Sequence, residues 1–181
     1  MKYVGLILRT LLWVYLSYLF VILLTSYHPA EAGYRPPFGL FIIDTINLFI
    51  HEAGHLFFKL FGMWLHILAG SLFQVLIPLA LLVVTWRQKI SQIGLPGFWL
   101  GESMINVSVY IKDAPVKQLK LIAKGLIHDW NWLLSGDLEA AEPLGDAVFL
   151  LGILLCAASI GAGITFAIRA FRQDSPPVPA E

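Results

Sequence analysis

Long runs of apolar residues are the feature that most limits what this chain can fold into. Three such runs cover about residues 4–24, 65–86 and 147–168, and each is close to the roughly 20 residues that a helix needs to cross a hydrocarbon core. Two further segments, about 38–61 and 91–110, have similar length but carry ionisable or amide side chains. The pattern predicts an all-α fold, a polytopic transmembrane helical bundle of about five spans.

The composition agrees with a membrane protein. Hydrophobic residues make up 58% of the 181 residues and charged residues 13%, and the mean hydropathy is +0.76, whereas soluble domains average about 45–50% apolar and about 25% charged residues. Twelve basic and twelve acidic residues balance, which gives no basic surface for a nucleic acid. We expect a multi-pass integral membrane protein in contact with lipid, with a bacterial cytoplasmic membrane as the working location.

The chain has the pattern of a single domain, because its longest polar stretch is only about 111–146 and no internal repeat is present. Residues 1–172 are expected to form one integral membrane domain, and the proline-containing segment 173–181 a disordered tail. The single cysteine, Cys156, lies in an apolar run. It therefore forms no disulfide within the chain and is expected to serve packing.

The N-terminal apolar segment allows two interpretations. Lys2 precedes it, and Ala30-Glu31-Ala32 has the small-x-small form of a signal-peptide cleavage site. The segment is long for a signal peptide, so a retained first span is favoured. Equal numbers of lysines and arginines would lie on the two sides of a five-span arrangement, so the positive-inside rule leaves the orientation open. The sequence leaves the oligomeric state open as well.

A surface helix is predicted between the fourth and fifth spans. From Pro115 to Ile127, lysines fall on one helical face and apolar residues on the opposite face, as in helices that lie in a membrane interface. Trp130 and Trp132 follow this segment, and tryptophan concentrates at the level of the lipid headgroups. A loop that is merely held at the interface by these side chains is the alternative.

The segment His51-Glu52-Ala53-Gly54-His55 has the pattern of a zinc site. In a helix, positions i and i+4 project in nearly the same direction, so His51 and His55 can bring two imidazole nitrogens to one ion. Catalytic zinc uses three protein ligands and one water molecule. Zinc lowers the pKa of that water toward about 7, and a glutamate can then accept its proton. The pattern predicts Zn²⁺ as cofactor, with Glu52 as the catalytic base.

The surroundings of this motif favour a metal site. Counted from the start of its span at about 1.5 Å per residue, His51 lies roughly 20 Å along the helix, and ionisable residues at such depth are costly and usually functional. The same helical face carries a polar stripe, which is typical of a face turned into a bundle. The stripe consists of Asp44, Asn47, His51, His55 and Lys59. The alternative is that neighbouring helices satisfy the two histidines structurally.

Two histidines do not complete a catalytic zinc site, so a third ligand must come from elsewhere in the chain. In the fourth span, Glu102, Asn106 and Asp113 fall close to one helical stripe. Asp113 is the preferred candidate, and His128 and Asp129 are alternates that could fold back over the site. Structural roles also stay open: Asp113 can end its helix, and Asp129 can cap the next one.

Three sequence elements resemble the site-2 protease class, the M50 intramembrane zinc metalloproteases. The HExxH motif is intact as HEAGH on a predicted span. Residues 69–74, Ala-Gly-Ser-Leu-Phe-Gln, are similar to the class's A-G-P-x-x-N element, with Ser71 and Gln74 in place of its proline and asparagine. Asn106 through Asp113 is similar to its N-x-x-P…D-G element, without the proline and glycine. In that class the aspartate of this element is the third zinc ligand.

The resemblance extends over roughly residues 38–114. It implies a zinc-dependent intramembrane endopeptidase that hydrolyses peptide bonds of membrane-embedded proteins or peptides, with Asn106 and Gln74 supporting the site or positioning the substrate. The altered positions leave an alternative, a catalytically silent M50-like membrane protein that acts as a partner-binding regulator or chaperone. A metal or proton transporter is a third hypothesis, weakened by the small number of spans.

Overall fold

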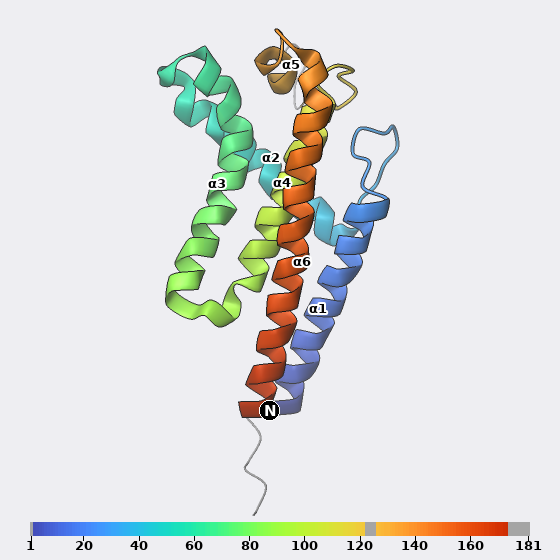
Figure 1. The fold of residues 1–181 in the computed structure, drawn as a ribbon, viewed down its shortest axis with the longest axis vertical. Coiled ribbons are helices and arrows are strands. Elements are labelled where there is room, and N and C mark those ends of the chain that lie inside the picture. The colour runs from blue at the N-terminus through green and yellow to red at the C-terminus, as the bar shows by residue number, and fades with distance from the viewer. Residues whose placement is uncertain (1, 122–125, 174–181) are drawn as a thin grey trace, which may run out of the picture.

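The computed structural model describes residues 2–121 and 126–173, and all regular structure in this part of the chain is helical, as predicted (Figure 1). The predicted tail therefore lies outside the described residues, except for Gln173 at the end of the last helix. The helices are α1 (Lys2–Thr25), α2 (Phe38–Phe58), α3 (Met63–Lys89), α4 (Gly94–Lys112), α5 (Asp129–Leu133) and α6 (Ala141–Gln173). The 3-10 turns η1 (Lys59–Phe61), η2 (Ile90–Gln92) and η3 (Leu138–Ala140) connect them.

Four stretches of the described chain are long and apolar enough to cross a membrane: Tyr3–Thr25, Phe38–Phe61, Met63–Gln92 and Leu138–Gln173. They coincide with four of the five predicted spans. The fifth, α4, is a helix of 19 residues but is not among these four. Its polar composition has a physical reason, because α4 is enclosed by its neighbours. Glu102 and Ser103, for example, are both 0% exposed.

Both ends of the described chain lie at the same end of the molecule, where α1 begins and α6 ends (Figure 1). The rings of Tyr3 and Phe171 are 6.3 Å apart there. We call this the terminal end, and the opposite one the α5 end. α3 runs toward the terminal end and α4 returns from it, while α2 passes obliquely behind the other helices to the α5 end. Five helices that each ran the full length of the molecule would put the two chain ends at opposite ends. Here they lie at the same end, because α2 runs obliquely and does not carry the chain back to the terminal end.

Small residues bring α4 and α6 into direct backbone contact. A Cβ atom on Gly152 would lie 2.7 Å from the carbonyl oxygen of Gly101, and a Cβ atom on Gly101 would lie 2.6 Å from Sγ of Cys156. Neither position has room for a side chain. Such close approach supplies the van der Waals contact that holds helices together in lipid, where the hydrophobic effect does not. Cys156 itself is completely buried, in agreement with its predicted packing role.

The prediction of a surface helix at 115–127 is wrong for the residues that the structure describes there, which form turns and irregular loop; residues 122–125 lie outside them. The carboxylate of Asp113 accepts the backbone N–H groups of Gln118 (2.8 Å) and Leu119 (2.9 Å). In a helix, these N–H groups would donate to carbonyl oxygens one turn earlier. A side-chain acceptor at the end of α4 therefore competes successfully with the helix that the amphipathic pattern favours.

Replacing Gly152 by leucine should separate α4 from α6. The new side chain would meet backbone atoms of Gly101, which cannot rotate away, so we expect a loss of about 1–3 kcal/mol in the free energy of unfolding. Thermal unfolding of the purified protein in detergent measures it as a lower Tm. Gly161→Leu on the same helix is the matched control, because a Cβ atom there meets nothing within 4 Å. Equal losses in both variants would contradict this packing argument.

Candidate metal centre

The polar stripe of α2 faces the helical bundle over most of its length. Asn47 and His51 are buried, at 0% and 6% exposure, and Asp44 and His55 are half-buried. Lys59, the last residue of the predicted stripe, lies in η1 and is exposed. The helical period therefore places the two histidines of the HEAGH motif against other protein groups and not against lipid.

His51, His55 and Asp129 bring three ligand atoms to one point. The Nε2 atoms of His51 and His55 lie 2.8 and 3.1 Å from Oδ2 of Asp129, and all three atoms lie within 4.8 Å of one another. In a tetrahedral zinc site with bonds of about 2.0–2.1 Å, neighbouring ligand atoms are about 3.3–3.4 Å apart. Among the described residues, this cluster of two histidines and one aspartate has the composition and spacing to hold a metal ion.

Hydrogen bonding determines which nitrogen of His55 is free to bind a metal. Its Nδ1 lies 2.8 Å from the backbone carbonyl oxygen of His66, which can only accept, so Nδ1 carries the proton. Neutral His55 therefore points the lone pair of Nε2 at a carboxylate oxygen 3.1 Å away. Two facing lone pairs repel unless a cation lies between them or the ring is protonated, so the donor set fits a metal ion.

α3 approaches the two histidines at a glycine. A Cβ atom on Gly70 would lie 2.5 Å from Nε2 of His51 and 2.6 Å from Nε2 of His55. On α2, a Cβ atom on Gly54 would collide with the carbonyl oxygen of Ala69. Small residues therefore allow these two helices to come into close contact. It sets both imidazole rings directly against the backbone of α3.

Side chains on both sides of Asp129 fix its position. The backbone N–H of Asp129 donates to Oη of Tyr110 (3.3 Å). The other contacts are His128 Nε2 to Asp113 Oδ2 (2.9 Å), Trp130 Nε1 to Ser71 Oγ (3.0 Å) and Asn131 Nδ2 to the carbonyl oxygen of Ala114 (2.9 Å). Every residue of the His-Asp-Trp-Asn stretch is thus anchored to α2, α3 or the end of α4. In the sequence, the one feature that indicated a functional role for this stretch was its run of four polar or interfacial side chains.

The Asp129 carboxyl group stays ionised in this setting. Burial alone raises the pKa of a carboxyl group, but the hydrogen bonds to His51 and His55, and the positive charge that these rings carry when they are protonated and no metal is bound, outweigh burial here. They hold the pKa of Asp129 below its ordinary value. A carboxylate must be deprotonated to bind a metal, so Asp129 is in the required form at neutral pH.

Asp113, the preferred third ligand in the sequence analysis, lies elsewhere. Its carboxylate is occupied by the backbone of the following loop and by His128. The alternate candidate Asp129, and not Asp113, lies next to the two histidines. Because Asp113 directly follows the last residue of α4, its side chain turns back to close the loop and does not project toward α2. The other alternate, His128, supports Asp113 and is not part of the metal cluster.

Glu102 also lies outside the metal cluster. Its Oε2 accepts a hydrogen bond from Nδ2 of Asn47 at 2.8 Å, and the Oδ1 of Asn47 accepts from Nε1 of Trp99 (2.9 Å) and Oγ of Ser103 (3.1 Å). These groups join α2 to α4 in the interior of the bundle. The polar stripe of α4 thus serves, at this level, to hold the two helices together.

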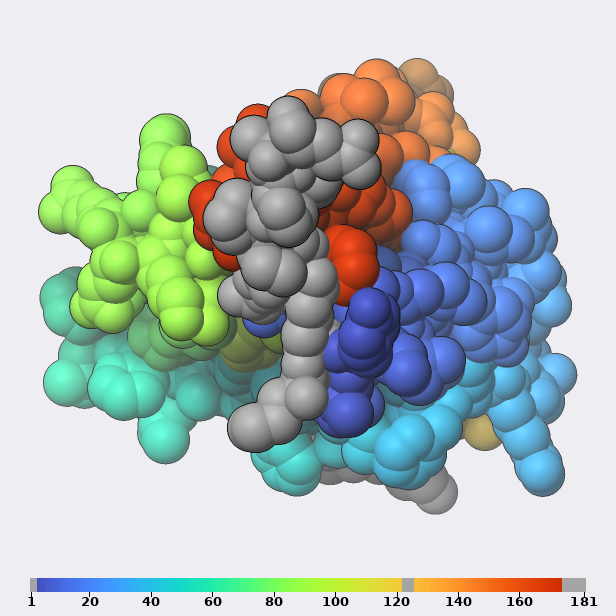
Figure 2. Space-filling view, turned by 90° about the horizontal axis from the view of Figure 1, so that it is seen from below, coloured from blue at the N-terminus to red at the C-terminus, as the bar shows by residue number. Residues whose placement is uncertain are grey.

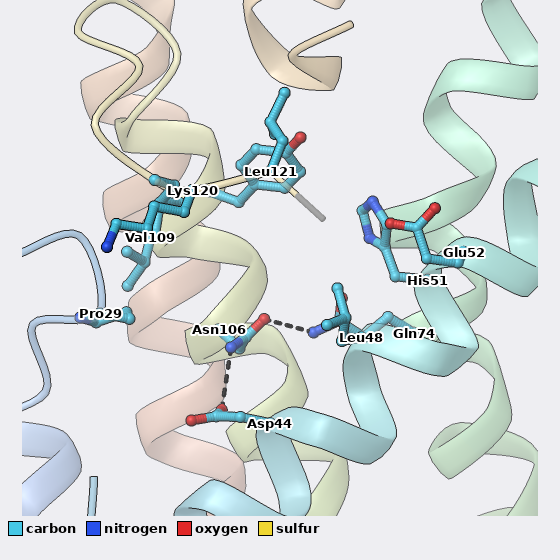
Figure 3. Close-up of a pocket in the computed structure, with 12 residues that line it drawn as sticks. Pro29, Asp44, Leu48, His51, Glu52, Gln74, Asn106, Val109, Lys120 and Leu121 are labelled. Atoms are coloured by element: carbon cyan, nitrogen blue, oxygen red, sulfur yellow. Dashed lines mark hydrogen bonds between the residues drawn. The ribbon is translucent and has the colours of Figure 1, made fainter. Parts of the chain in front are cut away.

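A cavity of about 290 Å³, which we call the amide cavity, opens beside the metal cluster. Asn106 and Gln74, the two predicted supporting residues, line it together with Asp44 (Figure 3). Nε2 of Gln74 donates to Oδ1 of Asn106 (2.7 Å), and Nδ2 of Asn106 donates to Oδ1 of Asp44 (3.1 Å). The walls of this cavity therefore carry polar groups from α2, α3 and α4.

A second cavity of about 350 Å³, the His66 cavity, also adjoins the cluster. His66, Ile67 and Ile127 line it, together with the three residues of the metal cluster. Glu52 and Tyr110 line both cavities. The metal cluster therefore lies where the two cavities meet.

Glu52 is free to interact with a bound molecule. Its carboxylate lies beside the ring of His51 (Figure 3), is partly exposed, and lines both cavities. Within residues 2–121 and 126–173, no hydrogen bond or ion pair engages this carboxylate. An unpartnered carboxylate next to a metal cluster is in the position of a general base.

Comparisons with known proteins assign no family to the chain: no family model, no curated protein and no solved structure matches it.

Substitution of the third ligand provides a direct test of this cluster. Asp129→Ala should abolish tight binding of a divalent metal, measured as metal per protein by mass spectrometry of the purified chain. Asp113→Ala should keep the metal with an affinity lowered about 10–100-fold, because Asp113 acts only by holding the neighbours of a ligand.

Asp146→Ala, which removes an exposed carboxylate of α6, is the control and should bind metal as the wild type does. Full metal retention in Asp129→Ala, together with complete loss in Asp113→Ala, would show that Asp113 is the ligand after all.

Proposed function

We propose that this chain is a zinc-dependent intramembrane endopeptidase. The observation that supports it most strongly is the convergence of His51, His55 and Asp129 on one point, with Glu52 beside them where two cavities meet. Two histidines and a carboxylate with an open fourth position form a catalytic zinc set. Because the site is built on helices long and apolar enough to span a membrane, the substrate is a membrane-embedded protein or peptide. In this proposal α4 is a fifth membrane-embedded helix, shielded by the four apolar ones.

The ligand set narrows the choice of metal. Magnesium and calcium prefer sites made entirely of oxygen ligands, whereas imidazole nitrogen suits zinc. Iron(II) in oxygenases also binds two histidines and one carboxylate. The free carboxylate of Glu52, one residue after a ligand on the same helix, distinguishes the hydrolytic arrangement. Metal analysis of the purified protein separates zinc from iron directly.

In this proposal Glu52 carries out the proton transfers of peptide hydrolysis. When bound, zinc acidifies a water molecule and polarises the carbonyl group of the peptide bond. Glu52 accepts a proton from the water as the water oxygen bonds to the carbonyl carbon. Glu52 then returns this proton to the amide nitrogen as the C–N bond breaks. The products are a carboxyl group and an amine, which together contain the atoms of one added water.

Tyr110 is positioned to stabilise the negative charge that develops on the carbonyl oxygen. Its Oη accepts the N–H of Asp129, and its own proton is not donated to any residue of the described chain. The ring centroids of Tyr110 and His51 are 5.6 Å apart, and Tyr110 lines both cavities. A fixed O–H donor directed at developing charge lowers the barrier, because it needs no reorganisation during the reaction.

The amide cavity provides partners for a locally unwound substrate. Backbone groups in lipid are all hydrogen-bonded within the helix, so a transmembrane substrate must open at the cleaved bond. Oε1 of Gln74 has no hydrogen-bond partner in the part of the chain that the structure describes. It can therefore accept a backbone N–H group that the substrate releases, which gives Gln74 a positioning role.

A catalytically silent membrane protein that binds and regulates partners is the second candidate. Ser71 and Gln74, which stand where the M50 class has proline and asparagine, are engaged with Trp130 and Asn106 inside the protein. Their use as internal supports favours a fold and a metal that are kept without hydrolysis. A cleavage assay separates the two candidates, because both predict metal binding.

Glu52→Gln should abolish cleavage and keep the metal. We expect the rate of hydrolysis of a transmembrane peptide, with a fluorophore and a quencher at its two ends, to fall by about 10²–10⁴-fold in proteoliposomes, because the base is removed while the metal ligands stay. Glu139→Gln, which changes an exposed carboxylate within η3, is the matched control and should cleave normally. Undiminished cleavage by Glu52→Gln would remove Glu52 from the mechanism. No cleavage by the zinc-loaded wild type would favour the silent regulator.

Tyr110→Phe removes one hydroxyl group and should lower kcat by about 10²-fold or more, with a small change in KM, because the donor acts mainly on the transition state. Metal content should equal that of the wild type. Tyr18→Phe, at an exposed position of α1, serves as the control for the loss of a phenol. A fall in metal content that parallels the fall in kcat would instead make Tyr110 a structural support for Asp129.

A further inference from the structure

A separate cavity of about 530 Å³ lies at the terminal end, away from the metal cluster. α1, α3, α4 and α6 all contribute to its walls. The lining is apolar on one part, with Leu12, Trp13 and Phe166, and cationic on another, with Arg9 and Lys89. None of its lining residues belongs to the amide cavity or the His66 cavity.

The indole ring of Trp13 gives this cavity a fixed wall. The ring packs against two glycines, Gly94 of α4 and Gly163 of α6, and a Cβ atom at either position would collide with it. The Trp13 ring therefore joins α1 to the backbones of α4 and α6 at the two glycines. A pocket with walls of this kind is formed before any ligand arrives, which lowers the cost of binding.

The charged residues that the structure describes around this cavity are all cationic. Arg9, Arg87, Lys89, Arg169 and Arg172 lie near the terminal end, and no Asp or Glu of the described chain accompanies them. Figure 2 views the molecule from this end, with the start of α1, the turn between α3 and α4 and the end of α6 toward the reader. The side chains of Arg9 and Lys89 form no ion pair or hydrogen bond with any described residue.

We propose that this cavity binds one phospholipid with a net negative headgroup. Arg9 and Lys89 bind its phosphate, and an acyl chain lies along Leu12, Trp13 and Phe166. Basic pockets between transmembrane helices recognise anionic lipid headgroups in this way. A zwitterionic lipid fits less well, because its ammonium group would enter a pocket that has two cations and no carboxylate in its lining. This site is independent of the metal cluster and of the proposed hydrolysis.

The lining also contains hydroxyl and amide groups. Thr85 lies one helical turn before Lys89 on α3, and Ser91 and Gln92 follow Lys89 in η2. These groups can donate hydrogen bonds to phosphate oxygens or to the glycerol region of a lipid. Along α3, Lys89 at the helix end is followed toward the interior by Thr85 and then Leu81, which is the order of charged, polar and apolar groups in a phospholipid. A membrane-spanning peptide segment has no such sequence of groups, so the cavity favours a lipid over a helix.

The test compares two defined lipids on the purified full-length protein in detergent, with bound lipid counted by native mass spectrometry. Dioleoylphosphatidylglycerol should bind at one site, more tightly than dioleoylphosphatidylcholine. The double variant Arg9→Gln/Lys89→Gln should lose about 30-fold in affinity for phosphatidylglycerol, because each cation near an anionic headgroup contributes roughly fivefold. Inorganic phosphate should not displace the lipid, because it cannot contact the apolar walls.

The double variant Arg87→Gln/Arg172→Gln is the matched control. It removes the same charge from the same end, but neither residue lines the cavity. An equal loss of affinity in this control would overturn the proposal and show that the overall positive charge of the end attracts the lipid. Displacement by phosphate alone, or equal binding of the two lipids, would overturn it as well. Ala167→Leu keeps all charges but fills the cavity, and it should lower lipid occupancy if an acyl chain enters.

Discussion

The meeting of two imidazole nitrogens with one carboxylate oxygen, those of His51, His55 and Asp129, is the interaction on which the metal centre depends. Charged groups buried between helices cost free energy unless they are paired or bind a metal. Much of the surrounding structure serves to hold this contact. Gly70 leaves room for both rings, and the hydrogen bond from Nε1 of Trp130 to Oγ of Ser71 holds the residue that follows Asp129 against α3.

The sequence alone predicts those features of the structure that depend on residues close together in the chain. Apolar runs of about 20 residues predict helices long enough to cross a membrane, and the i, i+4 spacing of His51 and His55 predicts that both face one ion. The third ligand could not be found in this way. Asp129 reaches the histidines only because its neighbours make long-range contacts with α3 and α4. Asp113 had the right residue type and fell close to the helical stripe of Glu102 and Asn106, but α4 ends just before it, so its carboxylate closes a loop.

The path of α2 and the polarity of α4 show what hydropathy does not measure. Composition tells how well a helix tolerates lipid, but it does not tell the direction in which the helix runs. α4 can carry polar residues because its neighbours enclose it, and its Glu102 accepts a hydrogen bond from Asn47 in the interior of the bundle. α2 is apolar enough to span a membrane, yet it crosses obliquely (Figure 1). A count of spans from the sequence therefore describes these two helices least well.

The oblique angle of α2 explains why the cavities lie where they do. In its first half, α2 is held to α4 by two hydrogen bonds: Asp44 accepts one from Asn106, and Asn47 donates one to Glu102. In its second half, Gly54 presses α2 against α3 instead. A helix bound to one neighbour at its start and to another at its end must diverge from the first, and the space that opens between α2 and α4 is the amide cavity beside Glu52. Under the proposed function, this divergence admits water and an unwound peptide to the metal centre while both ends of α2 stay packed.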